Sequence, residues 1–323
     1  MKLGELTVVF DSIARTHHAA DWDNVGLLVG DPACEVRAAM LCIDLTAPVL
    51  AEVRKHKAQL ILAYHPPLFK PPTTLTPQSA PILWATLQAK LAIYSMHTAL
   101  DVATGGTNDV LAGVLGMTPD GPIEPAEASR TCKVVVFTPT GNVDSVATAA
   151  FEAGAGQIGD YAECSFRSGG EGTFLGGEST TPAIGLKGMR ERVPEIRLEV
   201  VCPTKQMHAV VEAIRAVHSY EEPAIDVYPL IVQAHSGMGR VGGFGKSVTE
   251  QTLISRIKRG LGVKHVLVAR PQGRSSQVTV RRAACAAGSC GEMWRQAANV
   301  GATFYVTGEM KHHDALAASA AGL

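Results

Sequence analysis

The stretch Ile61-Leu-Ala-Tyr-His-Pro-Pro-Leu-Phe-Lys-Pro71 is an apolar run that ends abruptly at a histidine, and Tyr94-Ser-Met-His-Thr-Ala-Leu-Asp101 repeats this pattern. Short apolar runs of this kind are typical of buried β-strands. In an open α/β sheet, ligands gather beyond the carboxyl ends of the strands, and neighbouring strands lie roughly 4.8 Å apart. We therefore expect His65, His97 and Asp101 to converge on one ion.

Strand-like and helix-like segments alternate around these two runs. A helix is expected at residues 5–15 and a strand that ends at Gly30. The alternation predicts βαβ units and an α/β fold with a mainly parallel sheet. Further along the chain, the expected strands are residues 40–44, 60–64 and 91–96, and the expected helices are residues 48–57, 80–90 and 105–115, with Asp101 in a loop.

The rhythm changes after residues 117–130, a Pro-rich polar stretch that we interpret as a linker. The next segments read β-α-β-β-α-β, the order of the ferredoxin-like split unit. A Gly-rich stretch at residues 236–245 returns the chain to α/β, with expected strands at 265–269, 278–284 and 303–306, and helices at 249–260, 292–299 and from about 312. We expect a core built from both ends of the chain, residues 1–118 and 240–323, with an inserted domain at residues 131–232.

Composition excludes several classes of function. The 323 residues are 46% hydrophobic and 18% charged, with a net charge of -1 and a pI of about 6.8. This balance gives no bulk attraction for nucleic acid or for an anionic membrane. No apolar run approaches the ~20 residues that span a bilayer. Seven cysteines without a CxxC pair indicate reduced thiols, so we expect a cytoplasmic protein, with a nuclear or mitochondrial pool compatible.

The predicted cluster of His65, His97 and Asp101 has the chemistry of a metal site. Imidazole and carboxylate groups suit zinc, iron or manganese, and such sites commonly leave positions open for water. Asp101 could bridge two ions, as in dinuclear hydrolases. The alternative is that each histidine is a structural residue with a satisfied hydrogen bond at a strand end.

Three other motifs carry weaker signals. Glu309, His312 and His313 follow the last expected strand, and Glu309 and His313 would share a helix face. They would take part in catalysis or orient a ligand or the substrate. The alternative is a polar surface at the start of a helix. Residues 154–159 match GxGxxG, but a helix precedes them, so we reject dinucleotide binding and interpret Gly154 as a helix end. For residues 218–223, we favour a helix end bonded to a turn over a separate site.

Taken together, these motifs resemble the NGG-one-interacting-factor-three-like (Nif-three-like) family, in the family's order from residue 21 to residue 323. The matching motifs are Trp22-Asp-Asn-Val-Gly-Leu27, Tyr64-His-Pro-Pro67, His97-Thr-Ala-Leu-Asp101, Gly105-Gly-Thr-Asn-Asp109, Ala155-Gly-Gln-Ile-Gly-Asp-Tyr161, His218-Ser-Tyr-Glu-Glu-Pro223 and Thr307-Gly-Glu-Met-Lys-His-His-Asp-Ala-Leu316.

The resemblance implies an α/β core with a dinuclear metal site and an inserted domain of the CutA/PII type. It also implies homo-oligomers, as dimers or toroidal assemblies of dimers. Some members are called GTP cyclohydrolase type 2 homologues, and eukaryotic members are described as partners of transcription factors. A small phosphate-containing or nucleotide-like ligand is thus expected.

Two departures from the family pattern are visible. Many members have His-His-Pro where this chain has Tyr64 and His65, so His65 and Asp101 carry over as ligands and His97 lies beside them. The Tyr-His-Pro-Pro variant resembles the eukaryotic branch. Members also continue into another strand that ends in a His-x-x-x-Glu ligand pair, so we expect a gene model or fragment truncated after Leu323.

We therefore expect a metal-dependent hydrolase that holds one or two divalent ions per full-length chain through His65, Asp101 and His97. Glu309 and His313 would transfer protons or position the substrate. The alternative is a non-catalytic oligomeric scaffold or regulatory protein-interaction partner.

Overall fold

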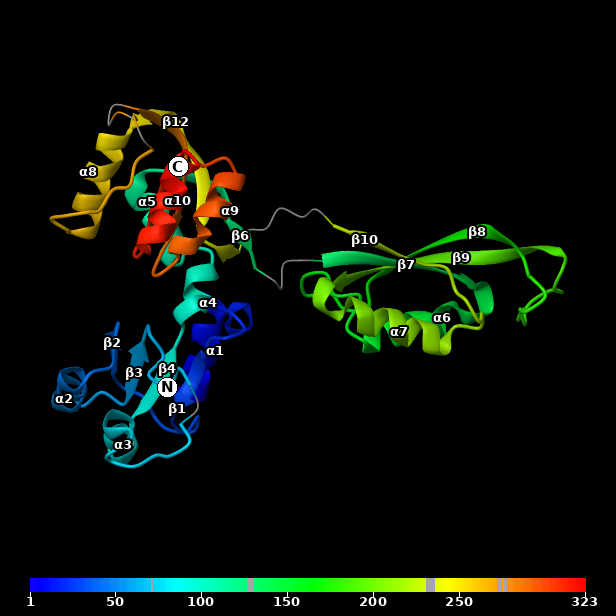
Figure 1. Cartoon of the computed structure of the whole chain (residues 1–323). Coiled ribbons are helices and arrows are strands. Elements are labelled where there is room, and N and C mark those ends of the chain that lie inside the picture. The colour runs from blue at the N-terminus through cyan, green and yellow to red at the C-terminus, as the bar shows by residue number, and fades with distance from the viewer. Residues whose placement is uncertain (71, 127–130, 231–235, 272, 274, 276–277) are drawn as a thin grey trace. The chain divides into compact units, whose positions relative to one another are not determined.

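The computed structural model describes residues 1–70, 72–126, 131–230, 236–271, 273, 275 and 278–323. The chain divides into two compact units (Figure 1). The core unit comprises Met1–Ala126 and Ala234–Leu323, and the insert unit comprises Glu127–Gln233. No helix in the described part of the chain is long and apolar enough to cross a membrane.

The first sheet of the core unit has the strand order β1-β4-β3-β2. Strands β2, β3 and β4 are parallel and β1 is antiparallel to β4. The sheet is therefore mainly parallel, as predicted. Its elements are α1 (Leu3–Ile13), β1 (Gly26–Val29), β2 (Ala39–Cys42), α2 (Ala47–Lys55), β3 (Leu60–Ala63), α3 (Pro81–Gln88) and β4 (Ala92–Ser95).

Both faces of the first sheet are covered, because side chains alternate along each strand. Leu60 and Ala92 pack with residues of α1, whereas Ile61 and Ile93 pack with residues of α2 and α3. This arrangement explains why β3 and β4 are apolar on consecutive positions. Strand β2 matches the strand expected at residues 40–44, and Leu41 on it is 75% exposed because β2 lies at the edge of the sheet.

The second sheet has the order β14-β13-β12-β5, and only the β13–β14 pair is parallel. The expectation of a mainly parallel core is wrong for this half. Helices α5 and α8 pack on one face, and α9 packs on the other. The elements are α4 (His97–Val102), α5 (Thr107–Leu115), β5 (Thr118–Gly121), β6 (Glu124–Pro125), β11 (Gly237–Met238), β12 (Arg240–Thr249), α8 (Glu250–Leu261), β13 (Thr279–Ala286), α9 (Trp294–Asn299), β14 (Tyr305–Thr307) and α10 (His312–Ala320).

Three expected segments differ from the structure. The expected linker contains β5 and β6, and the Gly-rich stretch forms β11 and most of β12. Gly242 permits this pairing, since a Cβ there would lie 2.1 Å from the carbonyl oxygen of Thr118. The strand expected at residues 265–269 is absent from the structure, and Leu267 there is fully exposed.

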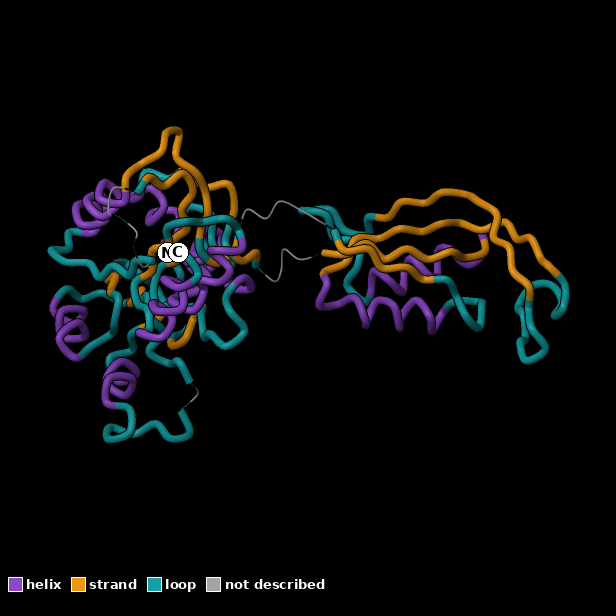
Figure 2. Tube along the Cα trace, turned by 45° about the horizontal axis from the view of Figure 1, so that its top comes forward, coloured by secondary structure: helices purple, strands orange, loops and turns teal. Residues whose placement is uncertain are grey.

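The insert unit follows the order β-α-β-β-α-β and forms one antiparallel sheet with the strand order β10-β7-β9-β8. Helices α6 and α7 pack against one face (Figure 2). Strands β8 and β9 pair over eleven positions and continue the sheet past the helices. The elements are β7 (Thr131–Pro139), α6 (Val143–Glu152), β8 (Ser165–Leu175), β9 (Arg190–Pro203), α7 (Met207–Val217) and β10 (Ile225–Pro229).

Gly154 and His218 of the insert unit each have a structural role. Gly154 follows α6 with a φ of +99° and ends that helix. At the end of α7, His218 lies between the carbonyl oxygen of Phe137, 3.1 Å from Nε2, and the peptide N–H of Tyr220, 3.0 Å from Nδ1. His218 thus bonds a helix end to a turn.

Candidate metal and active site

The candidate site lies at the carboxyl edge of the first sheet. Two backbone bonds extend the parallel pairing beyond β3: the N–H of Tyr64 donates to Cys42 and that of His65 donates to Ile43. His97 follows β4 after one residue and begins α4. Because both strands end at the same edge, the rings of His65 and His97 lie 5.4 Å apart between centroids.

Each histidine ring is held by an aspartate. His65 Nδ1 lies 2.8 Å from Asp44 Oδ1, and His97 Nδ1 lies 2.9 Å from Asp23 Oδ1. An ionised carboxylate only accepts hydrogen bonds, so each Nδ1 carries a proton, and in the neutral form of the ring Nε2 has the lone pair that a metal ion would take. Carboxylates orient metal-binding histidines in this way.

The two aspartates lie at the ends of strands that run in opposite directions. Asp44 follows β2, which is parallel to β3, whereas Asp23 precedes the antiparallel β1. The side chain of Asp23 is fully buried and also accepts hydrogen bonds from the N–H and hydroxyl of Thr98. Burial alone raises the pKa of Asp23, but the hydrogen bonds from His97 and Thr98 outweigh it and hold this pKa below its usual value.

Asp101 is only 5% exposed. It lies in the short helix α4 and not in the expected loop. Its Oδ1 accepts hydrogen bonds from Tyr64 Oη at 2.6 Å and from the hydroxyl of Thr107. Burial raises the pKa of the Asp101 carboxyl. Burial and the charge of Asp101 likewise raise the pKa of Tyr64, so the tyrosine stays a proton donor.

Hydrogen bonds connect α4 to the second half of the core unit. The buried Asn108 donates to the carbonyl of Asp101 at 2.9 Å and accepts from the N–H of Ala287 at 2.7 Å. Cys290 lies close enough for the charge of Asp101 to act on it; burial, with this charge, raises the pKa of the thiol to about 11. The loop after β13 is therefore part of the wall behind Asp101.

Two aromatic rings stand at the rim of the site. Trp22 is 62% exposed and Phe69 is 45% exposed. Their ring centroids lie 5.8 Å apart, and Trp22 lies 6.1 Å from His97 in edge contact. Asn24 donates to the carbonyl of Leu68 and so ties the loops that carry the two rings.

Glu309 and His313 do not share a helix face, because α10 begins at His312, after the cap residue Lys311. The peptide N–H of Glu309 donates to Gly288 at 3.1 Å, while the residue itself and His313 are exposed. Within the described part of the chain, neither side chain bonds to His65, His97 or Asp101.

The side chains in the cluster are of the types that bind divalent cations, but their positions do not form a complete metal site. The Nε2 atoms of His65 and His97 and the Oδ2 atom of Asp101 are the donors left free by the bonds described above. Across residues 1–70, 72–126 and the other described ranges, however, no three histidine, cysteine, aspartate or glutamate side chains are placed to hold one ion. The side chain of His65 is half exposed, so its ring is accessible from solvent.

Sequence reasoning missed Asp23, Asp44, Tyr64 and Thr107 as members of this cluster. Asp44 was within reach, since it lies two residues after β2 just as His65 lies two residues after β3. Asp23 was not, because its place depends on β1 being antiparallel, and strand direction leaves no mark in a four-residue segment.

Comparison with known proteins gives one consistent family. The family model Duf34/NIF3 (NGG1p interacting factor 3) matches residues 1–323. The "GTP cyclohydrolase 1 type 2 homolog" of Listeria monocytogenes is 33% identical over 313 residues, which are 96% of this chain and 83% of that protein. The protein of the same name from Mycobacterium tuberculosis is 34% identical over 320 residues, covering 98% and 83%.

Solved structures agree with the sequence relatives. A Bacillus cereus protein related to NIF3 has a TM-score of 0.64 and 34% identity, covering all of this chain and 86% of that one. The Staphylococcus aureus protein SA1388 has a TM-score of 0.70 and 28% identity, covering 100% and 85%. These relatives are bacterial and lend no support to the expected eukaryotic branch. The chain belongs to the Duf34/NIF3 family.

Proposed function

We propose that the cluster binds a divalent cation, zinc, iron or manganese, through His65, His97 and Asp101, and that the protein is a metal-dependent hydrolase. The observation that carries this proposal is the matched anchoring of the two imidazoles. Both Nδ1 atoms are held by aspartates 2.8 and 2.9 Å away, which leaves the Nε2 atom of each ring for a ligand role. Carboxylates orient metal-binding histidines in this way, which favours a metal site over two structural histidines.

The charge around the rings supports cation binding. Asp23, Asp44 and Asp101 all contact the histidines or the tyrosine beside them. Burial of Asp101 makes its charge costly unless a cation or several donors stabilise it. A bound divalent cation would stabilise it and would supply a water of lowered pKa for hydrolysis. The hydroxyls of Tyr64 and Thr107 would then hold Oδ1 of Asp101 in place and leave Oδ2 to bind the cation.

A nucleotide-like substrate is the favoured class. The exposed rings of Trp22 and Phe69 offer faces on which a base can stack, and such stacking is worth about 1–3 kcal/mol per base. The names of the relatives from Listeria and Mycobacterium point to the same class. Glu309 and His313 stay predictions as proton-transfer or substrate-positioning groups.

The second candidate is a non-catalytic oligomeric scaffold or regulatory partner of other proteins. Tyr64 favours it, since this residue occupies the place of a second histidine ligand and bonds to Asp101. Homo-oligomers, as dimers or toroids of dimers, are compatible with either function, and so is a cytoplasmic location.

Hydrolysis of GTP by the purified chain tests the proposal. We expect activity after loading with zinc, iron(II) or manganese, loss with chelator, and recovery when the metal is returned. Asp101→Asn should lower the rate at least tenfold, about 1.4 kcal/mol in the barrier. The exposed His208 lies in the insert unit, so His208→Ala is the control and should keep the rate. Equal GTP turnover with and without metal would overturn the enzyme proposal.

A further inference from the structure

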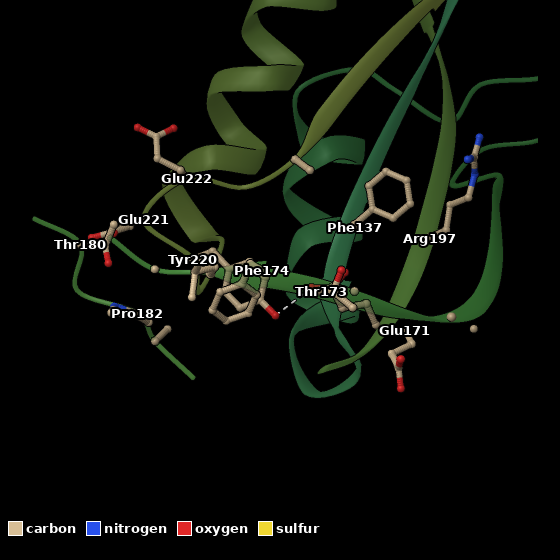
Figure 3. Close-up of a pocket in the computed structure, with 18 of the residues that line it drawn as sticks. Phe137, Glu171, Thr173, Phe174, Thr180, Pro182, Arg197, Tyr220, Glu221 and Glu222 are labelled. Atoms are coloured by element: carbon tan, nitrogen blue, oxygen red, sulfur yellow. Dashed lines mark hydrogen bonds between the residues drawn. The ribbon is translucent and has the colours of Figure 1, made fainter. Parts of the chain in front are cut away.

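The insert unit contains a cavity of about 610 Å³ (Figure 3). Strands β8 and β9, the turn around Pro182 and the segment from Tyr220 to Ala224 line it. The volume is that of a typical small-molecule site. All of the lining residues belong to the insert unit, so this cavity is independent of the candidate metal site.

A buried carboxylate is the central polar group of the cavity. Glu195 is only 9% exposed, and its Oε1 accepts a hydrogen bond from Tyr220 Oη at 2.8 Å. The carboxylate lies over Gly172 of β8, where a Cβ would come within 2.2 Å of Oε2. A residue without a side chain therefore makes room for the carboxylate at this point of the strand.

The other charges around the cavity already have partners. Arg197 lies over the ring of Phe137 at 5.7 Å and bonds to Glu199 at 2.8 Å, and Glu171 pairs with Arg192. Glu221 accepts the peptide N–H of Thr181. Among the described residues, no cation pairs with Glu195, and its Oε2 has no donor. A carboxylate in a largely buried side chain with one oxygen unbonded is a favourable place for a cationic partner.

Aromatic rings complete the lining beside this carboxylate. Phe174 and Tyr220 lie 6.2 Å apart between centroids in an edge contact, and both line the cavity with Phe137. Ring faces attract ammonium groups, most strongly where water is excluded. A carboxylate without a cation beside aromatic rings therefore selects positive charge on an apolar body, and it repels anions.

We propose that the cavity of the insert unit binds a small organic amine. Its ammonium group donates to Oε2 of Glu195, and its apolar part packs against Phe174 and Tyr220. The ammonium group then supplies the hydrogen-bond donor and the positive charge that Oε2 of Glu195 lacks, while Tyr220 holds Oε1 in place. This binding does not depend on the metal-dependent reaction proposed above.

Calorimetric titration of the full chain with phenethylamine tests the proposal, with 2-phenylethanol as the neutral match and 3-phenylpropionate as the anionic one. We expect one saturable site per chain for the amine, at least tenfold weaker binding of the alcohol, and no binding of the acid. Glu195→Gln should remove the preference for the amine. Glu152 lies exposed on α6 and outside the cavity, so Glu152→Gln should retain it.

Equal binding of the amine and the alcohol would overturn the proposal, and so would a Glu195→Gln protein that is folded by circular dichroism and binds the amine unchanged. If Glu195→Gln unfolds, the amine, alcohol and acid series on the unaltered chain decides the question alone. Tighter binding of Nα-acetyl-lysine amide than of any simple amine would overturn it in favour of a docking site for a protein lysine.

Discussion

At the scale of single residues, the direction of a side chain matters as much as its identity. Hydrogen bonds to Asp44 and Asp23 orient the rings of His65 and His97. The hydroxyls of two neighbouring residues donate to the same oxygen of Asp101 and orient its carboxylate. The sequence allowed His65 and His97 to be predicted just beyond two neighbouring strands, because the end of a strand is readable from an apolar run. Their convergence with Asp101 on one ion stays a prediction. Their partners were not predictable, since hydrogen-bond partners depend on neighbours in space.

We expect the metal affinity of the cluster to depend on the residue at position 64. Tyr64→His places an imidazole where a hydroxyl now lies 2.6 Å from Asp101, and we expect zinc affinity to rise at least tenfold because a nitrogen ligand is added. Tyr64→Phe is the matched control, since it removes the hydroxyl and adds no ligand. Competition with a chromogenic chelator measures both, and equal affinity of the two variants would refute the expectation.

His218 makes the stability of the protein depend on pH. Burial lowers its pKa from the usual 6.5, although Phe137 and Glu195 act in the opposite direction. Below pH 6.5 the unfolded chain binds this proton more readily than the folded one, so stability falls as pH drops from 6.5 to the lowered value. Urea unfolding against pH should show this slope, and His218→Gln should reduce it.

The exposed His208 provides the control for that measurement. His208→Gln should keep the slope of the unaltered protein, because its ring is already in contact with water. An identical slope in the His218→Gln protein would show that His218 does not govern the change.

At the scale of elements, prediction succeeded where periodicity was strong. Strands β3 and β4 and helix α5 were placed within two residues, because each combines an apolar pattern with a clear end signal. Strand β12 was missed, since its stability comes from close approach to β5 and not from side-chain pattern. Residues 265–269 have strand-like composition, but they pair with no strand in the described part of the chain, and all except the partly buried Val266 are exposed.

An ion pair between the buried Arg240 of β12 and the partly buried Asp109 of α5 also connects β11 and the end of α4. Arg240, only 2% exposed, donates to Asp109 at 2.6 and 3.0 Å and to the carbonyl groups of Ala103, Gly237 and Gly239. Removal of one partner leaves a poorly solvated charge and unpaired carbonyls, so Arg240→Met should lower the free energy of unfolding by about 3–5 kcal/mol.

Chemical denaturation measures this loss, and Arg37→Met is the control. Arg37 pairs with Glu35 at the surface, where both side chains are more than 70% exposed, and such pairs contribute little. A change below about 1 kcal/mol for Arg240→Met would contradict the structural role of the buried pair.

At the scale of the whole molecule, two units share one chain. The hydrophobic core of the insert unit consists of residues between Cys132 and Ile225 only, whereas the core unit is built from both ends of the chain. We expect residues 127–233 produced alone to fold and to unfold cooperatively, because a unit with its own core can fold independently. Dispersed amide signals in an NMR spectrum are the expected result; a spectrum collapsed into the random-coil range would contradict it.

The central claim is that distant segments of the core unit meet to bind a cation. The most direct measurement is the metal content of the purified full chain after zinc loading and removal of excess, by plasma mass spectrometry. We predict at least one ion per chain, lost in His65→Ala and in Asp101→Ala and kept in His208→Ala. A chain that retains no zinc, or the same zinc content in all four proteins, would contradict the account.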